Sequence, residues 1–235
     1  MARKPQSKKT IGVTQKIKNE SGRYVNYKKK GARPSHRSYS SAMRRNSRIK
    51  KSQRGMAFGR KVDTLINDYV RKKITKGSSE MIREARAVID AIENRLNLTP
   101  VDCQVTVHWE KWNIRADIDV VCKNRNNKAH IIEVKTTQTP FKGGINKYFG
   151  MKQNEKKENV YEDDVKNMVC FGIETMTTSY NEHQLQLFSQ IIGYKKLMNL
   201  DYYPEGHVVL IQRGSAKASV FSSETWRQKH GVKLL

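Results

Sequence analysis

The two apolar segments between Asn113 and Thr137 constrain this chain most, because each interrupts a buried pattern with charged residues. The segments NIRADIDVVC and AHIIEVKTT are joined by the turn-prone stretch KNRNNK. Side chains two apart in a strand point to the same face, so we expect Asp117 and Asp119 to share one side. Glu133 and Lys135 likewise share a side of the second strand. Pairing these strands brings carboxylates and an ammonium together on an apolar sheet, which is costly unless a cation lies among the carboxylates.

Such a pair of strands carries the parts of a phosphodiester hydrolase. Carboxylate oxygens favour a hard divalent cation, Mg²⁺ or Mn²⁺, over zinc. The cation lowers the pKa of a bound water and polarises the phosphoryl group. A lysine beside it can orient or deprotonate that water, or stabilise charge that develops on the phosphate.

Hydrophobic periodicity predicts an α/β domain with a central mixed sheet flanked by helices. The expected order is helix, helix, three strands, helix and strand, at residues 56–74, 78–96, 101–109, 114–122, 129–135, 182–200 and 207–212. On the last helix, a rotation of about 100° per residue places four residues on one polar stripe. They are His183, Gln186, Gln190 and Tyr194.

The start of the second helix leaves two roles open for an acidic residue. Ser78 or Ser79 can cap this helix. Glu80 then lies in its first turn, where a carboxylate complements the helix dipole. The other option for Glu80 is a metal-ligand role.

Positive charge is concentrated at the N-terminus. Residues 1–60 hold ten Lys, nine Arg and one acidic residue, which gives +18 of the formal net charge of +24. Residues 1–55 contain too little apolar surface to offset their conformational entropy, so we predict a disordered basic arm that contacts nucleic acid. Solubilisation or localisation is the alternative role. The basic residues expected at the nucleic acid are Arg44, Arg45, Arg48, Lys50, Lys51 and Arg54.

Residues 138–180 interrupt the periodic pattern with glycines and with Lys-rich and acidic stretches around a short apolar patch. Insertions of this length are usually functional or disordered. Two interpretations stay open: a mobile flap or strand-guiding loop beside the site, and a disordered insertion. The predicted organisation is an arm over residues 1–55 and a domain over residues 56–235 that contains this insertion.

The cysteines Cys103, Cys122 and Cys170 show no C-x-x-C spacing. This argues for an intracellular, reducing compartment and against a zinc ribbon or a disulfide framework. We therefore expect no zinc. With a nucleic-acid partner, the nucleus or another compartment that holds DNA is one option. The chain also lacks an apolar run of the roughly 18 residues that span a membrane, and its first residues lack an apolar signal core.

At its central strands the sequence resembles the PD-(D/E)XK nuclease superfamily. The match consists of Asp119, a connecting turn, and then Glu133-Val134-Lys135. ADIDVV and IIEVKT are similar to the metal-binding strands of that superfamily.

Two helices are similar to those of its RecB-like and phage-type alkaline exonucleases. MAFGRKVDTLINDY resembles their opening helix, with Asp63 where a histidine is common. Gln190 and Tyr194 match their Q-x-x-x-Y element, and Gln186 stands one turn earlier as a substitute for the glutamine.

The resemblance implies a restriction-endonuclease-like core and Mg²⁺ or Mn²⁺ as the cofactor. Asp119 and Glu133 would hold the metal, with the carbonyl of Val134 as a further ligand. Lys135 would position the nucleophilic water. Asp117 is the alternative first ligand. If Asp119 is the ligand, Asp117 would instead support the ligands without binding the metal.

The resemblance also assigns the polar stripe of the last helix. Gln186 or Gln190, with Tyr194, would orient this machinery or contact DNA. From its place on the stripe, and not from the resemblance, we expect His183 to be a helix-surface residue or to contact the substrate rather than to bind the metal. Some relatives hold an iron–sulfur cluster, which three scattered cysteines cannot supply.

We therefore expect a Mg²⁺-dependent deoxyribonuclease, an exonuclease that a basic arm holds on DNA, with RNA still open as a substrate. One alternative is a structure-specific endonuclease on the same fold. The other is a non-catalytic nucleic-acid-binding or packaging protein.

Overall fold

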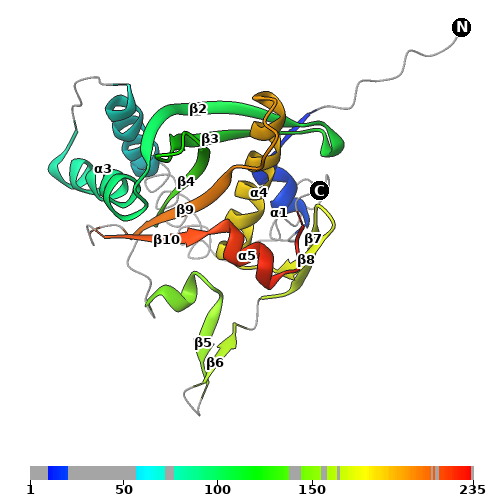
Figure 1. Cartoon of the computed structure of the whole chain (residues 1–235). Coiled ribbons are helices and arrows are strands. Elements are labelled where there is room, and N and C mark those ends of the chain that lie inside the picture. The colour runs from blue at the N-terminus through cyan, green and yellow to red at the C-terminus, as the bar shows by residue number, and fades with distance from the viewer. Residues whose placement is uncertain are drawn as a thin grey trace, which may run out of the picture.

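The centre of the molecule is a mixed six-stranded sheet with helices on both faces (Figure 1). The computed structural model describes residues 10–20, 57–71, 77–137, 144–154, 158–162, 165–212, 214 and 217–233. The α/β class with a mixed sheet flanked by helices, expected from the sequence, is confirmed.

The sheet runs in the order β1, β3, β4, β9, β10, and β2 pairs with β3 as well. β3 is antiparallel to both β2 and β4, and β10 is antiparallel to β9, whereas the β1–β3 and β4–β9 pairs are parallel. These strands are β1 (Ile11–Gly12), β2 (Thr99–Trp109), β3 (Ile114–Lys123), β4 (Ala129–Thr137), β9 (Glu205–Gln212) and β10 (Ala218–Ser222).

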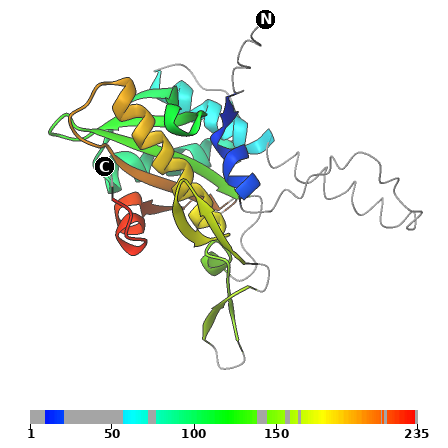
Figure 2. The ribbon, with the colours of Figure 1, turned by 90° about the vertical axis from the view of Figure 1, so that its right-hand side faces the viewer.

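The helices form two layers, one on each face of the sheet, and each layer covers one buried hydrophobic cluster. The α4-side cluster includes Ile131 and Leu185, and the α3-side cluster includes Val88 and Ile132. The first packs under α1 (Val13–Glu20), α4 (Ser179–Leu197) and α5 (Ser223–Lys229). The second packs under a helix over residues 57–70, under α3 (Ser79–Asp90) and under the π-helical turn η1 (Ala91–Arg95). Figure 2 shows α4 lying across the sheet.

Side-chain caps fix where α3 and α4 begin. The Ser78 hydroxyl accepts a hydrogen bond from the Met81 N–H, so Ser78 is the N-cap of α3 and Glu80 lies in the first turn. Thr178 caps α4 in the same way through the N–H of Asn181. Each cap satisfies an N–H that has no partner within the helix. The expected capping of the second helix is thus confirmed, with Ser78 as the residue.

Part of the expected basic arm is folded, which corrects the prediction of disorder over residues 1–55. Ile11 and Gly12 pair with Ile114 and Arg115 of β3. Their successor α1 buries Val13 and Ile17 in the α4-side cluster, with exposed fractions of 3% and 2%. Two apolar residues four apart are enough to hold one helical turn against an existing core. Residues 1–9 and 21–55 lie outside the described residues.

The region 138–180 also contains ordered elements, so neither a disordered insertion nor a loop alone describes it. Its elements are η3 (Gly144–Lys147), β5 (Met151–Gln153), β6 (Asn159–Tyr161), β7 (Asn167–Cys170) and β8 (Ile173–Met176). The β5–β6 hairpin projects from the body of the molecule (Figures 1 and 2). The β7–β8 hairpin instead buries Met168 and Cys170 in the α4-side cluster.

The side chains of β3 change face at Asp119, contrary to the expected alternation. Ile118 lies in the α4-side cluster, whereas Val120 lies in the α3-side cluster, although they are two residues apart. β2 bends at the same level, where Gln104 has a positive φ of 57°. Asp117 and Asp119 therefore do not share a face, which corrects the prediction.

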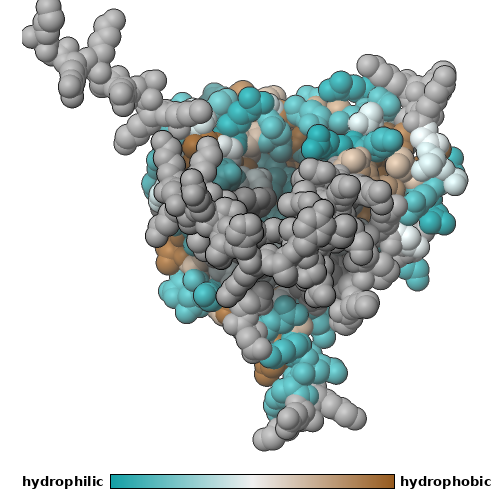
Figure 3. Space-filling view, turned by 180° about the vertical axis from the view of Figure 1, so that it is seen from behind, coloured by the Kyte–Doolittle hydropathy of each residue, from teal (hydrophilic) through white to brown (hydrophobic). Residues whose placement is uncertain are grey.

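None of the helices among the described residues is long and apolar enough to cross a bilayer. The coloured part of the face in Figure 3 is mostly hydrophilic, with small separate hydrophobic patches.

Candidate active site

The site forms at a gap along one edge of β3. β2 occupies the other edge, so β1 and β4 must share this one. β1 pairs at Ile114 and Arg115, and β4 pairs from Val120 to Lys123. Residues 116–119 lie between these two ladders, and we call this stretch the gap in the β3 edge.

Two side chains satisfy the backbone at this gap. The amide Nε2 of Gln190 donates to the carbonyl of Asp117 at 2.8 Å. The carboxylate of Asp119 accepts the N–H of Val134 at 2.8 Å. Buried backbone polar groups need such partners where no strand supplies them. The gap therefore draws polar side chains from α4 and β3 to one place.

Glu133 is the centre of this group. Its side chain is completely buried and receives three donors. Gln186 Nε2 donates to Oε1 at 2.6 Å, and Gln190 Nε2 donates to Oε2 at 2.5 Å. The ammonium of Lys135 forms an ion pair with Oε1. The sequence left open which of the two glutamines faces the site. In the structure both do, and both bind Glu133.

Several carboxylates act on one another here. Burial raises the pKa of Asp119 well above its usual value, and the negative charges of Glu133 and Asp63 raise it further. Burial alone would lower the pKa of Lys135, but the attraction of Glu133, Asp119 and Asp63 outweighs it and raises the pKa. Lys135 is therefore protonated at neutral pH and serves as a cation and hydrogen-bond donor.

Asp63 belongs to the site, although sequence reasoning did not assign it a role. Its pKa is raised to about 6, because burial and, less strongly, the charge of Glu133 outweigh the lowering effect of Lys135. Asp63 reaches the site because the helix over residues 57–70 packs close to β4. A Cβ on Gly59 would lie 2.8 Å from the Thr136 hydroxyl, and Asp63 follows Gly59 by one turn. The available signal was its position in the segment MAFGRKVDTLINDY, where the resembling nucleases often carry a histidine.

The expected backbone ligand also lies at the gap. The N–H and C=O of one residue in a strand face the same edge. Since the N–H of Val134 reaches Asp119, its carbonyl faces the same gap. Val134 is therefore placed where a cation held by Asp119 could reach its oxygen.

Three further predicted residues are not brought into this group. The Asp117 carboxylate faces outward and accepts from the Thr106 hydroxyl at 2.6 Å. Glu80 lies in the first turn of α3, and it is not among the charges that act on Asp119, Lys135 or Asp63. Tyr194 is buried in the α4-side cluster. Burial raises its pKa most, and the charges of Asp102 and Tyr202 raise it as well.

His183 lies at the border of the site, one turn before Gln186 on α4. Its Nδ1 is 2.9 Å from the hydroxyl of Tyr148. Burial raises the pKa of Tyr148, and the charges of Tyr180 and Glu133 add to this. Tyr148 was not predicted as a site residue, because it lies in a turn directly after the short 3₁₀ segment η3, where the sequence gives no periodic signal. The basic residues expected at nucleic acid, Arg44 to Arg54, lie outside the described residues.

The donor set fits a hard divalent cation. Asp63, Asp119 and Glu133 supply three carboxylates against the single positive charge of Lys135. Like charges in a buried site raise the pKa of a neighbouring carboxyl group, as they do for Asp63 and Asp119, unless a cation offsets them. Oxygen ligands of this kind favour Mg²⁺ or Mn²⁺.

No protein-family model matches the chain, and no curated protein matches it significantly.

Proposed function

We propose that this chain is a metal-dependent phosphodiester hydrolase. More specifically, we propose a DNA exonuclease with a restriction-endonuclease-like core. The observation that carries the proposal is the convergence of Asp119, Glu133 and Lys135 at the gap in the β3 edge, with both glutamines of α4 bonded to Glu133. The resemblance to the PD-(D/E)XK nucleases, which rests on these same residues, supports the choice of reaction.

The residues divide the work. Asp119, Glu133 and the carbonyl of Val134 would hold Mg²⁺ or Mn²⁺. The cation would lower the pKa of a bound water and neutralise charge on the phosphate. Gln186 and Gln190 fix the Glu133 carboxylate by donating to both of its oxygens. Their amides prevent rotation of the carboxylate, which keeps the ligand atoms in place.

Lys135 acts on the nucleophile. The raised pKa keeps its ammonium protonated, so it can donate a hydrogen bond to the attacking water and hold its lone pair toward phosphorus. The same charge stabilises the negative charge that develops on the phosphate. Removing the ammonium should therefore slow turnover.

The test uses end-labelled linear DNA and circular DNA of the same sequence. Incubation with Mg²⁺, Mn²⁺ or EDTA should give metal-dependent loss of the linear substrate, and the circle should survive, because an exonuclease needs an end. Lys135→Ala and Asp119→Asn should each reduce the rate at least about 100-fold. Cleavage of the circle would point to the endonuclease instead.

Asp117→Asn is the matched control, because it makes the same change two residues away on the outward face. It should retain cleavage, whereas Asp119→Asn should not. If neither substitution alters Mg²⁺-dependent cleavage, the site is wrong. If the natural chain binds DNA and cleaves neither substrate with either metal, a non-catalytic binding protein remains.

A further inference from the structure

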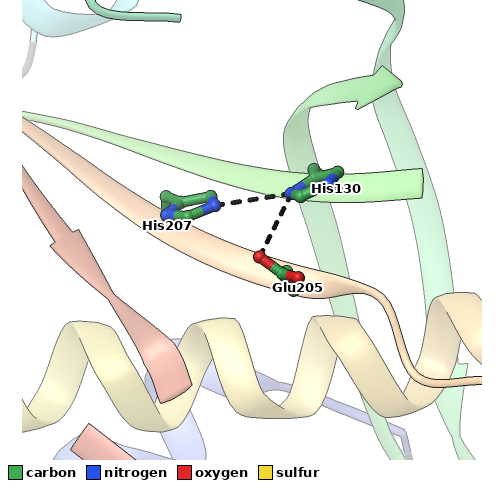
Figure 4. Close-up of side chains that lie close together, drawn as sticks. All are labelled: His130, Glu205 and His207. Carbon is green, nitrogen blue, oxygen red and sulfur yellow. Dashed lines mark hydrogen bonds and ion pairs between the residues drawn. The ribbon is translucent and has the colours of Figure 1, made fainter. Parts of the chain in front are cut away.

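A second cluster of ligating side chains lies at the beginning of β9. Its members are His130, Glu205 and His207, which point toward one another in Figure 4. The parallel register of β4 and β9 places His130 beside Glu205 and Ile132 beside His207. Residues two apart share a face, so all three ligating side chains project from the same side of the sheet.

That side is opposite to the proposed nuclease site. Ile132 and Val209, which follow His130 and His207 by two residues, belong to the α3-side cluster. Glu133 instead projects toward α4, where the glutamines bind it. The cluster of His130, Glu205 and His207 is therefore a separate group of ligands.

The spacing of the three atoms suits one small cation. Nδ1 of His130 lies 3.4 Å from Nε2 of His207 and 3.8 Å from Oε2 of Glu205, and all three atoms lie within 4.8 Å of one another. Ligand atoms about 2.0–2.1 Å from a tetrahedral zinc are roughly 3.3 Å apart. A direct hydrogen bond explains the two rings less well, because 3.4 Å exceeds the usual N–H···acceptor distance of about 2.7–3.2 Å.

Both imidazoles are buried, whereas the carboxylate reaches solvent. His130 and His207 are 6% and 8% exposed, whereas the Glu205 side chain is 59% exposed and gives access from solvent.

We propose that His130, Glu205 and His207 bind a zinc-class transition metal, with solvent in the fourth position. Two imidazole nitrogens and one carboxylate form a donor set that favours Zn²⁺ over Mg²⁺. The metal ties β4 to β9 at the start of the strand that carries Glu133 and Lys135. It is independent of the cation that the nuclease site would hold.

Zinc titration of the purified full chain, in the presence of excess Mg²⁺, tests the site. We expect one Zn²⁺ per chain, and Co²⁺ in its place should give the intense visible absorption of a four-coordinate site. His207→Gln and His130→Gln should each weaken Zn²⁺ binding at least tenfold, because loss of an outer-shell partner alone costs 10–100-fold. Zn²⁺ should also raise the unfolding temperature of the natural chain but not of these variants.

Two further variants separate this site from the rest of the chain. His108→Gln removes an exposed histidine outside the cluster, and Glu133→Gln disables the carboxylate site; both should bind Zn²⁺ as the natural chain does. Glu205→Gln changes an exposed residue, so it should fold even where a histidine variant does not, and it should bind Zn²⁺ at least tenfold more weakly. Unchanged affinity in Glu205→Gln, or loss of binding in Glu133→Gln, would overturn the proposal.

Discussion

Among single residues, Glu133 has the most demanding environment. It is a completely buried carboxylate on an apolar strand, and its oxygens are satisfied by Gln186, Gln190 and Lys135. A buried charge is tolerated only when it is paired and hydrogen-bonded. The two glutamines thus have a stabilising role that is separate from any catalytic one.

Gln190→Leu should show both roles. It leaves Glu133 Oε2 and the carbonyl of Asp117 without their donor. We expect the free energy of unfolding in EDTA to fall by about 1–3 kcal/mol, and the cleavage rate with Mg²⁺ to fall about 10- to 100-fold. Urea unfolding and single-turnover cleavage measure the two effects.

Gln184→Leu is the matched control on the same helix. Gln184 is completely buried, and neither of its amide atoms has a hydrogen-bond partner in the part of the chain that the structure describes. Replacing an unsatisfied polar side chain by an apolar one of similar size should be neutral or stabilising. Equal losses in both variants would show that Gln190 contributes only volume.

Asp63 predicts a pH dependence of stability in the metal-free protein. Its pKa of about 6 lies above the value of 3.8 for an unperturbed Asp, so the folded state retains a proton that the unfolded chain has released. The free energy of unfolding should therefore fall as pH rises from about 4 to 6, by on the order of 2–3 kcal/mol. Asp63→Asn should remove this part of the slope in urea unfolding at several pH values.

Asp119 contributes a dependence of the same sign, so the comparison of the two proteins isolates the share of Asp63. Saturating Mg²⁺ above pH 6 should restore the lost stability in the natural chain, because a cation favours the ionised carboxylates. Identical slopes with and without Asp63 would contradict its placement in the site.

At the scale of elements, close packing of α4 on the sheet sets the position of its glutamines. Gly193 allows this packing: a Cβ there would lie 2.8 Å from Cβ and Cγ2 of Val107. A β-branched side chain has little freedom to move away. The helix therefore depends on the absence of a side chain at Gly193, one turn after Gln190.

Gly193→Ala should lift this end of α4 from β2. Overpacking of this kind costs about 1–3 kcal/mol. Replacing glycine by alanine in a helix gains about 1 kcal/mol in helix propensity. The upper part of the overpacking range therefore exceeds the gain in helix propensity. We expect a lower melting temperature and slower cleavage, because Gln190 moves relative to Glu133. Gly12→Ala, where a Cβ would meet nothing within 4 Å, should leave both unchanged. A fully active, more stable Gly193→Ala protein would refute this role of the close contact.

The same elements show how far sequence reasoning reaches. β3, β4, α4 and β9 were predicted because each carries a long apolar period. Asp119, Glu133, Lys135 and the glutamines lie on three of these elements, and the resemblance to the PD-(D/E)XK nucleases assigned their roles. The β7–β8 hairpin was not, because its turn places Phe171 and Gly172 at positive φ, and phenylalanine is not a typical residue there.

Other features depend on tertiary contacts that no local pattern records. The change of face at Asp119 comes from the bend of β2 and from the exchange of β1 for β4 as a neighbour. Asp63 reaches the site only because the helix approaches β4 at Gly59. His130 and Glu205 are distant in sequence, and only the parallel register joins them; the expectation of no zinc rested on cysteines alone.

At the scale of the whole molecule, the folded N-terminal segment changes how the basic region is attached. α1 ends at Glu20 in the α4-side layer, and the next described helix begins at residue 57 in the α3-side layer. Residues 21–56 thus connect two elements that are both fixed to the domain. They contain twelve Lys and Arg and no acidic residue, which is half of the net charge of +24.

Ile17→Ala tests whether α1 belongs to the folded domain. Ile17 is 2% exposed, and truncating a buried isoleucine costs about 2–5 kcal/mol. We expect a loss in this range by urea unfolding, whereas Thr14→Ala, on the exposed side of α1, should change stability by less than about 0.5 kcal/mol. Equal effects would mean that α1 does not pack on the core in solution.

The charge of residues 21–56 should act on DNA affinity and not on the chemical step. Changing Arg44, Arg45, Arg48, Lys50, Lys51 and Arg54 to glutamine removes up to six phosphate contacts. The slope of log affinity against log salt for duplex DNA should then fall by up to about 5, because each contact contributes about 0.9. Single-turnover cleavage at saturating protein should persist, since the site at Glu133 is intact. Lys123→Gln, Lys128→Gln and Lys152→Gln together serve as the charge control outside this segment. They remove three charges instead of six, so an equal fall in slope per charge removed would assign the affinity to overall charge.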